Sequence, residues 1–147
     1  MADTNTIQRL RGKAAQNPKR IVFPETQDPR VIQAVKILAK EKLVVPILIG
    51  GEAVDGAEHV DPLDEKLLEE CASQLFENRK HKGLTREGAQ LAMEDPLLIA
   101  TLMTKIGRAD GCVAGSIATT ANVIRAGLYG VGTRAGAKLV SSFFLMQ

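Results

Sequence analysis

The sequence predicts an α/β fold with a mainly parallel sheet flanked by helices. Two features of the chain carry this prediction. Short apolar runs alternate with longer segments whose apolar residues recur at helical spacing. The runs themselves are nearly continuous, which is typical of strands that helices cover on both faces of a parallel sheet. With 147 residues, 45% of them hydrophobic and 24% charged, the chain has the length and composition of one globular domain or of a piece of a larger one.

The N-terminal third predicts a helix followed by a β-α-β unit. Residues 1–19 are mostly polar, with a few apolar residues on one helical face, and residues 20–24 form a short apolar strand. The pair Asp28-Pro29 combines a helix N-cap with a proline at the first helical position, so we expect a helix over residues 29–42. The apolar run at residues 44–49 then predicts a second strand, parallel to the first.

The rest of the chain repeats the same kinds of element. The helices that we expect cover residues 64–78, 85–93, 95–106 and 119–129, and the strands cover residues 59–60, 111–114 and 138–146. Thr85 and Asp95 have N-cap chemistry, and Gly107 ends the third of these helices. The last strand, Lys138 to Met146, is apolar and has nothing after it to cover it. We therefore expect the chain to be a fragment, or a partner polypeptide to cover this end.

Composition excludes several classes of function. The net charge of +2 and the scarcity of aromatic residues, with no Trp and one Tyr, argue against a nucleic-acid partner. Two distant cysteines, Cys71 and Cys112, and two histidines fit neither a disulfide framework nor a metal site. Cys71 lies on an apolar helical stripe and is interpreted as a small buried hydrophobe. No segment has the pattern of a signal peptide or a membrane span, so we expect a cytoplasmic protein with no membrane partner.

A small polar turn follows the strand at residues 111–114. Gly115 allows a ligand to approach the backbone, and Ser116, Thr119 and Thr120 offer hydroxyl groups at the start of a helix. An anion such as a phosphate or a carboxylate suits such a turn, because a helix N-terminus presents unpaired N–H groups. A plain strand-to-helix turn with Thr119 as its N-cap explains the same residues.

Basic and acidic residues outside this turn leave similar alternatives open. Arg79 belongs to the densest basic cluster, residues 78–82, which is either a solvated helix end or a clamp for a polyanionic ligand. Arg125 lies one to two turns inside the last helix, where an arginine is usually a surface residue. Glu25 and Asp28 follow the first strand, but Asp28 is accounted for as an N-cap, and no partner for acid–base chemistry is evident.

From Arg20 to Met146 the chain resembles the phosphate acetyltransferases and the related phosphate butyryltransferases. The resemblance rests on segments in matching order and spacing, namely RIVFPETQDPRVIQAVKIL, VVPILIG, RKHKGLT, DPLLIATLMTKIGRADGCVAGSIATTANVIRAGL and GAKLVSSFFLM. It implies reversible transfer of an acyl group between an acyl phosphate and coenzyme A. Coenzyme A is then a substrate, whose thiolate attacks the acyl phosphate directly, and no permanently bound cofactor is needed. The implied fold is of the isocitrate-dehydrogenase type, with two α/β domains around a cleft and usually a dimer.

The resemblance also assigns residues. Arg79 and Arg125 look like the family's arginines for coenzyme A, and the family's small polar loop, which faces the cleft and would take the acyl phosphate, matches Gly115, Ser116, Thr119 and Thr120. The chain departs from the common pattern at three places. Ala118 stands where many members have histidine, Ala126 where a proline often follows the arginine, and Thr26-Gln27 where Gly-Glu is common. These departures bear on the preferred acyl group.

The resemblance further implies that residues 1–147 are a truncated N-terminal α/β portion of a two-domain acyltransferase. The family's proposed catalytic serine, arginine and aspartate belong to its second half, so the catalytic residues of this protein are expected beyond residue 147 and the isolated chain is expected to be inactive or nearly so. Transfer of an acetyl group between acetyl phosphate and coenzyme A is the main hypothesis for the function. A phosphate butyryltransferase, a non-catalytic regulatory domain that senses acyl-coenzyme A, and a generic anion-binding domain are the alternatives.

Overall fold

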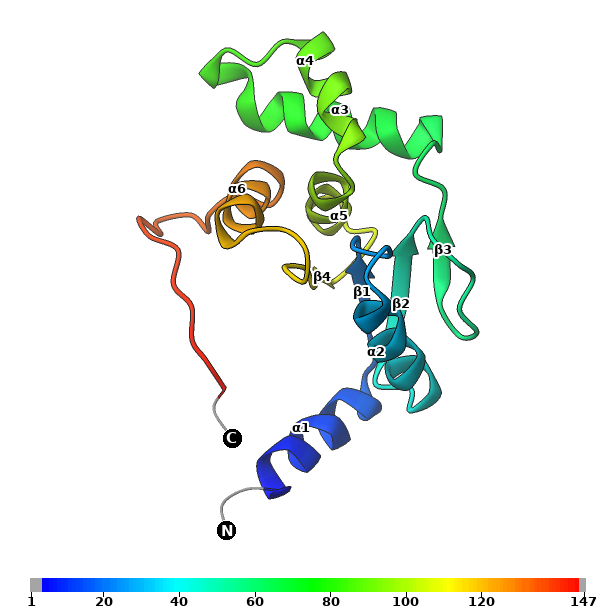
Figure 1. The fold of residues 1–147 in the computed structure, drawn as a ribbon. Helices are drawn as coiled ribbons and strands as arrows, with labels where there is room; N and C mark the ends of the chain where they lie inside the picture. Colours follow the sequence, from blue (N-terminus) through cyan, green and yellow to red (C-terminus); the bar gives the residue numbers. More distant parts are fainter. Residues whose placement is uncertain (1–3, 146–147) are drawn as a thin grey trace.

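The fold is built on a four-stranded parallel sheet (Figure 1). The computed structural model describes residues 4–145. The strand order is β3-β2-β1-β4, and the strands are β1 (Lys19–Phe23), β2 (Val44–Ile49), β3 (Glu58–Val60) and β4 (Gly111–Cys112). All three pairings are parallel, with Val22 opposite Ile47 on one side and opposite Cys112 on the other. The predicted α/β class with a parallel sheet is therefore confirmed.

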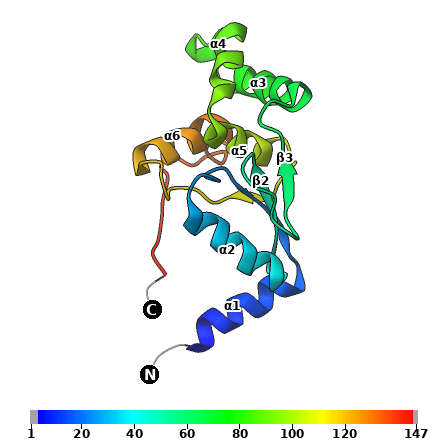
Figure 2. The same ribbon diagram turned by 45° about the vertical axis from the view of Figure 1, so that its right-hand side comes forward.

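Helices cover both faces of the sheet, as the continuous apolar strands predicted (Figure 2). Side chains of successive strand residues point to opposite faces. Phe23 and Leu48 pack with α2 (Pro29–Lys40) on one face, whereas Val22 and Ile47 contribute to a larger core formed with the later helices on the other. Neither face of these strands meets solvent, so neither face needs polar residues. This is why their sequences are unbroken apolar runs.

Local capping signals define the helix ends that the sequence predicted. The remaining helices are α1 (Thr4–Gln16), α3 (Glu65–Arg79), α4 (Arg86–Leu91), α5 (Pro96–Lys105) and α6 (Thr120–Gly130), with single 3₁₀ turns at Lys80–Lys82 and Ala92–Glu94. The side chains of Asp28, Thr85, Asp95 and Thr119 each accept a hydrogen bond from a backbone N–H in the first turn of the helix that follows. Gly107, with a positive φ of 79°, follows the end of α5 as expected.

The predicted strand at residues 138–146 is wrong over the described part of the chain. Residues 138–145 have no regular secondary structure, and Met146 lies outside the described residues. This segment lies apart from the sheet in both views (Figures 1 and 2). Phe143 and Phe144 are each 90% exposed. A strand gains its hydrogen bonds from a neighbouring strand, and apolar β-formers without such a neighbour cannot make one. The strand predicted at residues 111–114 is also shorter in the structure: β4 ends at Cys112, although the Val113 N–H still donates to the Val22 carbonyl of β1.

Close packing of α6 against α3 and α5 positions the functional residues discussed below. α5 is buried all round, because the sheet, α3 and α6 surround it. The tightest approach is at Gly130, where a Cβ atom would lie 2.1 Å from the hydroxyl oxygen of Thr101. A side chain at that position would therefore push α6 off α5. No helix among residues 4–145 is long and apolar enough to cross a membrane.

Candidate functional site

The turns after β1 and β4 meet at the carboxyl edge of the sheet, which is where open parallel sheets bind ligands. Glu25, in the turn after β1, reaches across to the turn after β4 and accepts five hydrogen bonds there. One oxygen accepts from the N–H groups of Gly115 and Ser116, both at 2.8 Å, and from the Ser116 hydroxyl at 3.0 Å. The other oxygen accepts from the N–H groups of Ile117 at 3.0 Å and Ala118 at 2.7 Å.

This arrangement is an anion-binding nest whose anion is a side chain of the protein. The Glu25 side chain is buried, with 7% of its surface exposed. Burial by itself raises the pKa of a carboxyl group, but the backbone hydrogen bonds, led by that from Ala118, outweigh it and lower the pKa of Glu25 from 4.5 to about 2. The carboxylate therefore holds the loop in one conformation and is no free general base near neutral pH.

The second carboxylate of this turn is also engaged. Asp28 caps α2 by accepting from the Arg30 N–H at 2.9 Å, and the Arg30 guanidinium contacts both of its oxygens, at 2.6 Å in the shortest case. Hydrogen bonds from the Arg30 side chain are the main reason that the pKa of Asp28 is lowered to about 2. Arg30 also donates to the Ser116 carbonyl at 3.2 Å, so its exposed guanidinium links the turn after β1 to the turn after β4.

The four residues predicted for an acyl phosphate lie within six positions of the chain, between β4 and the first turn of α6. Gly115 has a φ of 107°, a conformation that favours glycine, and the backbone N–H groups of Gly115 and Ser116 bind Glu25. The Thr119 hydroxyl accepts from Asn122 N–H at 3.3 Å as the N-cap of α6, and Thr120 is exposed in the first turn. The predicted N-cap at Thr119 is therefore confirmed, whereas binding of an acyl phosphate by these residues stays a prediction.

A groove, here called the α6 groove, runs along α6 away from this loop. It consists of two adjoining hollows of about 450 Å³ and 360 Å³ that share Asp95 and Asn122. The first lies against the nest and is bordered by Glu25, Ile117 and Ala118. The second lies further along the helix; besides the shared pair, it is lined by Ala92, Leu98, Arg125, Ala126 and Tyr129. From Thr120 to Tyr129 a helix rises about 14 Å, so the groove suits an extended ligand.

The two predicted coenzyme A arginines approach the far end of this groove. Arg125 lines it directly, and Tyr129 lies one helical turn further along the same helix. Arg79, at the end of α3, stacks on the Tyr129 ring, with its Cζ atom 3.9 Å from the ring centre. Arg79 and Arg125 lie 46 positions apart in the sequence, yet Arg79 contacts α6 one turn beyond Arg125. A groove with arginines at one end and a helix N-terminus at the other suits a ligand with several anionic groups.

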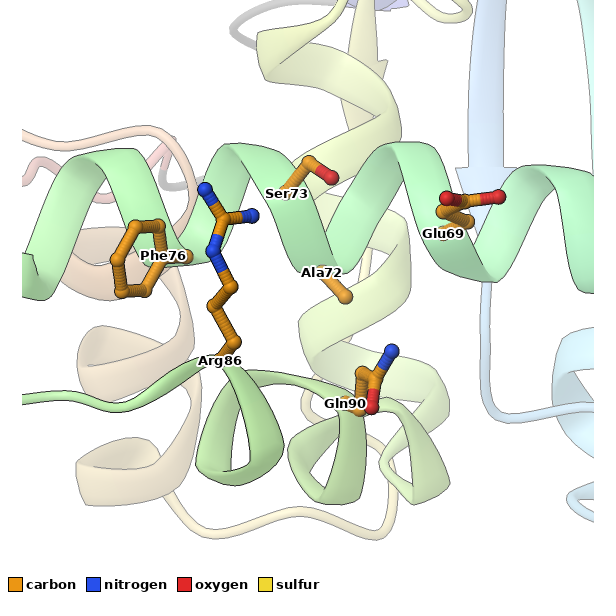
Figure 3. A pocket seen from close by; sticks show the side chains of 6 residues that line it. All are labelled: Glu69, Ala72, Ser73, Phe76, Arg86 and Gln90. Carbon is orange, nitrogen blue, oxygen red and sulfur yellow. The ribbon is translucent and has the colours of Figure 1, made fainter.

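A second hollow, between α3 and α4, lacks these features. It is small, about 80 Å³, and Figure 3 shows Arg86 rising from α4 with its guanidinium beside the Phe76 ring of α3, with a Cζ-to-centre distance of 4.5 Å. Glu69, Ser73 and Gln90 complete its polar lining. Within residues 4–145, no group of three or more His, Cys, Asp and Glu side chains is placed to hold a metal ion.

Comparison with known proteins identifies the family. The family model described as phosphate acetyl/butaryl transferase matches residues 5–147, nearly the whole chain. The chain belongs to this family. Curated members named phosphate acetyltransferase are 39% identical over 150 residues in Acetivibrio thermocellus and 39% identical over 140 residues in Paracoccus denitrificans, and each alignment covers 95% of this chain. The chain spans 45% and 44% of those two relatives.

Solved structures of the family have the same fold. A phosphotransacetylase from Streptococcus pyogenes superposes with a TM-score of 0.83 at 29% identity, covering 95% of this chain and 46% of that one. The EutD phosphotransacetylase from Staphylococcus aureus superposes with a TM-score of 0.80 at 27% identity, covering 92% of this chain and 44% of that one. The chain therefore spans less than half the length of each of these four relatives.

Three residues that organise the site are not predicted from the sequence in the roles that the structure gives them. The sequence suggests only acid–base chemistry for Glu25, although a carboxylate after one strand and a glycine turn after another are the signals of a nest at a shared sheet edge. Tyr129, the only tyrosine of the chain, is not predicted as a contact of Arg79. Asn78, which donates hydrogen bonds to the carbonyls of Tyr129 and Gly130, has no local signal that distinguishes it from a polar surface residue.

Proposed function

We propose that the chain is the N-terminal portion of a phosphate acetyltransferase, which transfers acetyl groups reversibly between acetyl phosphate and coenzyme A. The observation that carries this proposal is the α6 groove, which is bordered by Ile117 and Ala118 of the loop at one end and lined by Arg125 at the other. Arg79 stacks on Tyr129, which also lines that second end. Family membership and relatives named phosphate acetyltransferase support the same reaction.

Each end of the groove has a separate task in this proposal. Arg79 and Arg125 pair with phosphate groups of coenzyme A, because a guanidinium matches phosphate oxygens with several N–H donors. Thr119 and Thr120 donate to the acyl phosphate through their hydroxyl groups, since the nearby backbone N–H groups and the Ser116 hydroxyl already bind Glu25. Glu25 and Asp28 hold the turns after β1 and β4 in fixed positions relative to each other, and they take no part in proton transfer.

The remaining parts of the proposal concern the rest of the protein. We propose that a second α/β domain follows residue 147 and supplies the groups that activate the thiol and stabilise the transition state. Coenzyme A acts as a substrate without a permanently bound cofactor, and the complete protein is a cytoplasmic dimer. A phosphate butyryltransferase is the second candidate, because the family model covers both activities. Comparing initial rates with acetyl phosphate and butyryl phosphate separates the two.

Calorimetric titration of coenzyme A tests the binding half of the proposal. The sample is the longest polypeptide that the coding sequence specifies, and the variants are Arg79→Ala, Arg125→Ala and, as a matched control, Arg86→Ala. Arg86 also stacks on an aromatic ring, but it lies between α3 and α4, outside the groove. A charge-assisted hydrogen bond contributes about 1.5–3 kcal/mol, so each groove variant should weaken binding about tenfold or more and Arg86→Ala should not change it. Equal affinity in all four proteins would contradict the proposal.

A further inference from the structure

The contacts of Asn78 link α3 to the end of α6. The side-chain nitrogen of Asn78, in the last turn of α3, donates to the carbonyl oxygens of Tyr129 at 3.1 Å and of Gly130 at 2.9 Å. Its side-chain oxygen accepts from the Gln74 amide at 2.8 Å, which sets the amide so that its nitrogen faces α6. The last carbonyls of a helix lack partners within the helix, and Asn78 supplies donors for two of them.

The same two helix ends also carry the cation–ring contact of the groove. Arg79 follows Asn78 directly and stacks on the ring of Tyr129, whose carbonyl Asn78 binds. Arg125 is one turn before Tyr129 on α6. The distance between the two arginines therefore depends on how the end of α6 sits on the end of α3, and Asn78 bonds directly across that contact.

The packing gives α6 little freedom to compensate for the loss of Asn78. Gly130 is buried against Thr101 of α5, so the end of α6 cannot move closer to α5. Movement in the other direction, away from α5 and α3, breaks the bonds from Asn78 and uncovers the Tyr129 ring. An ordered ligand site with arginines on two different helices needs such a constraint, because a shift of about 1 Å is enough to misplace a bound group.

We propose that Asn78 is a positioning residue for coenzyme A: by bonding the end of α6 to α3, it holds Arg79 and Arg125 at the spacing at which both engage one coenzyme A molecule. This inference rests on the proposed function. It concerns a residue that does not touch the ligand and acts through the Arg79–Tyr129 contact.

The test combines a binding measurement with the chain's built-in reporter. Tyr129 is the only tyrosine, and residues 1–147 contain no tryptophan, so the tyrosine band of the near-ultraviolet circular dichroism reports on the Tyr129 environment. The variants are Asn78→Ala and the isosteric Asn78→Asp, which removes the donor and keeps the volume. The control is Thr85→Ala, which removes a hydrogen bond at the start of α4, away from the groove. In a polypeptide that continues beyond residue 147, the same band is read after subtraction of the Tyr129→Phe variant.

Both Asn78 variants should weaken coenzyme A binding about tenfold and reduce the Tyr129 band, with the far-ultraviolet spectrum unchanged. Thr85→Ala should leave both readouts as in the wild type. Combining Asn78→Ala with Arg79→Ala should weaken binding no more than Arg79→Ala alone, because the two residues act on one contact. A general loss of stability would instead add to the effect of Arg79→Ala.

Failure of this inference and failure of the proposed function give different results. Wild-type affinity in both Asn78 variants, or full additivity with Arg79→Ala, overturns the positioning role while leaving coenzyme A binding intact. If the wild type binds no coenzyme A, the proposed function fails. In that case an unchanged Tyr129 band in both Asn78 variants overturns the inference as well. A reduced band would still show that Asn78 controls the Arg79–Tyr129 contact.

Discussion

The burial of Glu25 in its nest makes stability depend on pH in a way that one substitution isolates. Replacing Glu25 by Gln keeps the size of the side chain but removes its charge, and it points an NH₂ group at N–H donors that need an acceptor. The pKa of Glu25 falls from 4.5 to about 2 in the folded chain, and one pKa unit corresponds to about 1.4 kcal/mol. The ionised carboxylate thus contributes about 3 kcal/mol to the free energy of unfolding at neutral pH.

The direction of the pH effect follows from the lowered pKa. Because the folded state holds its proton more weakly than the unfolded state, the contribution of Glu25 is fully present above pH 4.5 and is lost as the pH falls from 4.5 towards 2. The free energy of unfolding of the wild type minus that of Glu25→Gln should therefore be constant between pH 7 and 5.5. Between pH 4.5 and 3 it should shrink by about 2 kcal/mol.

Urea denaturation at several pH values, followed by far-ultraviolet circular dichroism, measures this difference. Asp28 also has a pKa of about 2 and titrates in the same range, but it is present in both proteins, so its contribution cancels in the difference. The exposed Glu52→Gln is the matched control and should follow the wild type at every pH. Parallel stability curves for the wild type and Glu25→Gln from pH 7 to 3 would refute the nest as a source of stability.

The other two predictions concern packing and thiol reactivity. Gly130→Ala should lower the free energy of unfolding by about 1–3 kcal/mol, because the added carbon would meet the Thr101 hydroxyl at 2.1 Å. Urea denaturation measures this, with the uncrowded Gly127→Ala as control, and equal losses in the two variants would contradict the close contact. Cys71 is fully buried, and burial raises the pKa of its thiol to about 11, so a disulfide reagent at pH 8 should label it only after unfolding. Rapid labelling of Cys71 in the folded chain would show that α3 is not packed as described.

Local chemistry made most of the fold predictable. Asp28, Asp95 and Thr119 each accept a hydrogen bond from a residue two or three positions further on, so their role as helix caps depends on sequence neighbours alone. The apolar strand at residues 44–49 was predicted with the bounds that the structure has. The strand at residues 138–146 was not, because a strand depends on a partner that its own residues do not specify.

The candidate site was predictable only where a residue acts through its own neighbourhood. The turn of Gly115 and Ser116 could be recognised as suited to an anion, because a glycine and hydroxyl groups before a helix have that property wherever they occur. That its backbone N–H groups bind Glu25 could not be foreseen, since the partner lies 90 residues earlier and arrives through the pairing of β1 with β4.

The sequence by itself determined the α/β class, the parallel sheet covered on both faces, the helix ends and the family, because these follow from periodicity, capping and ordered motifs. Only the tertiary structure decided that Glu25 occupies the nest, that Arg79 stacks on Tyr129 at the end of the α6 groove that Arg125 lines, and that Asn78 bonds the two helix ends. The physical reason is the range of the contacts. Caps and periodic faces are set within about one or two turns of the chain, whereas these contacts depend on how separate helices and strands pack.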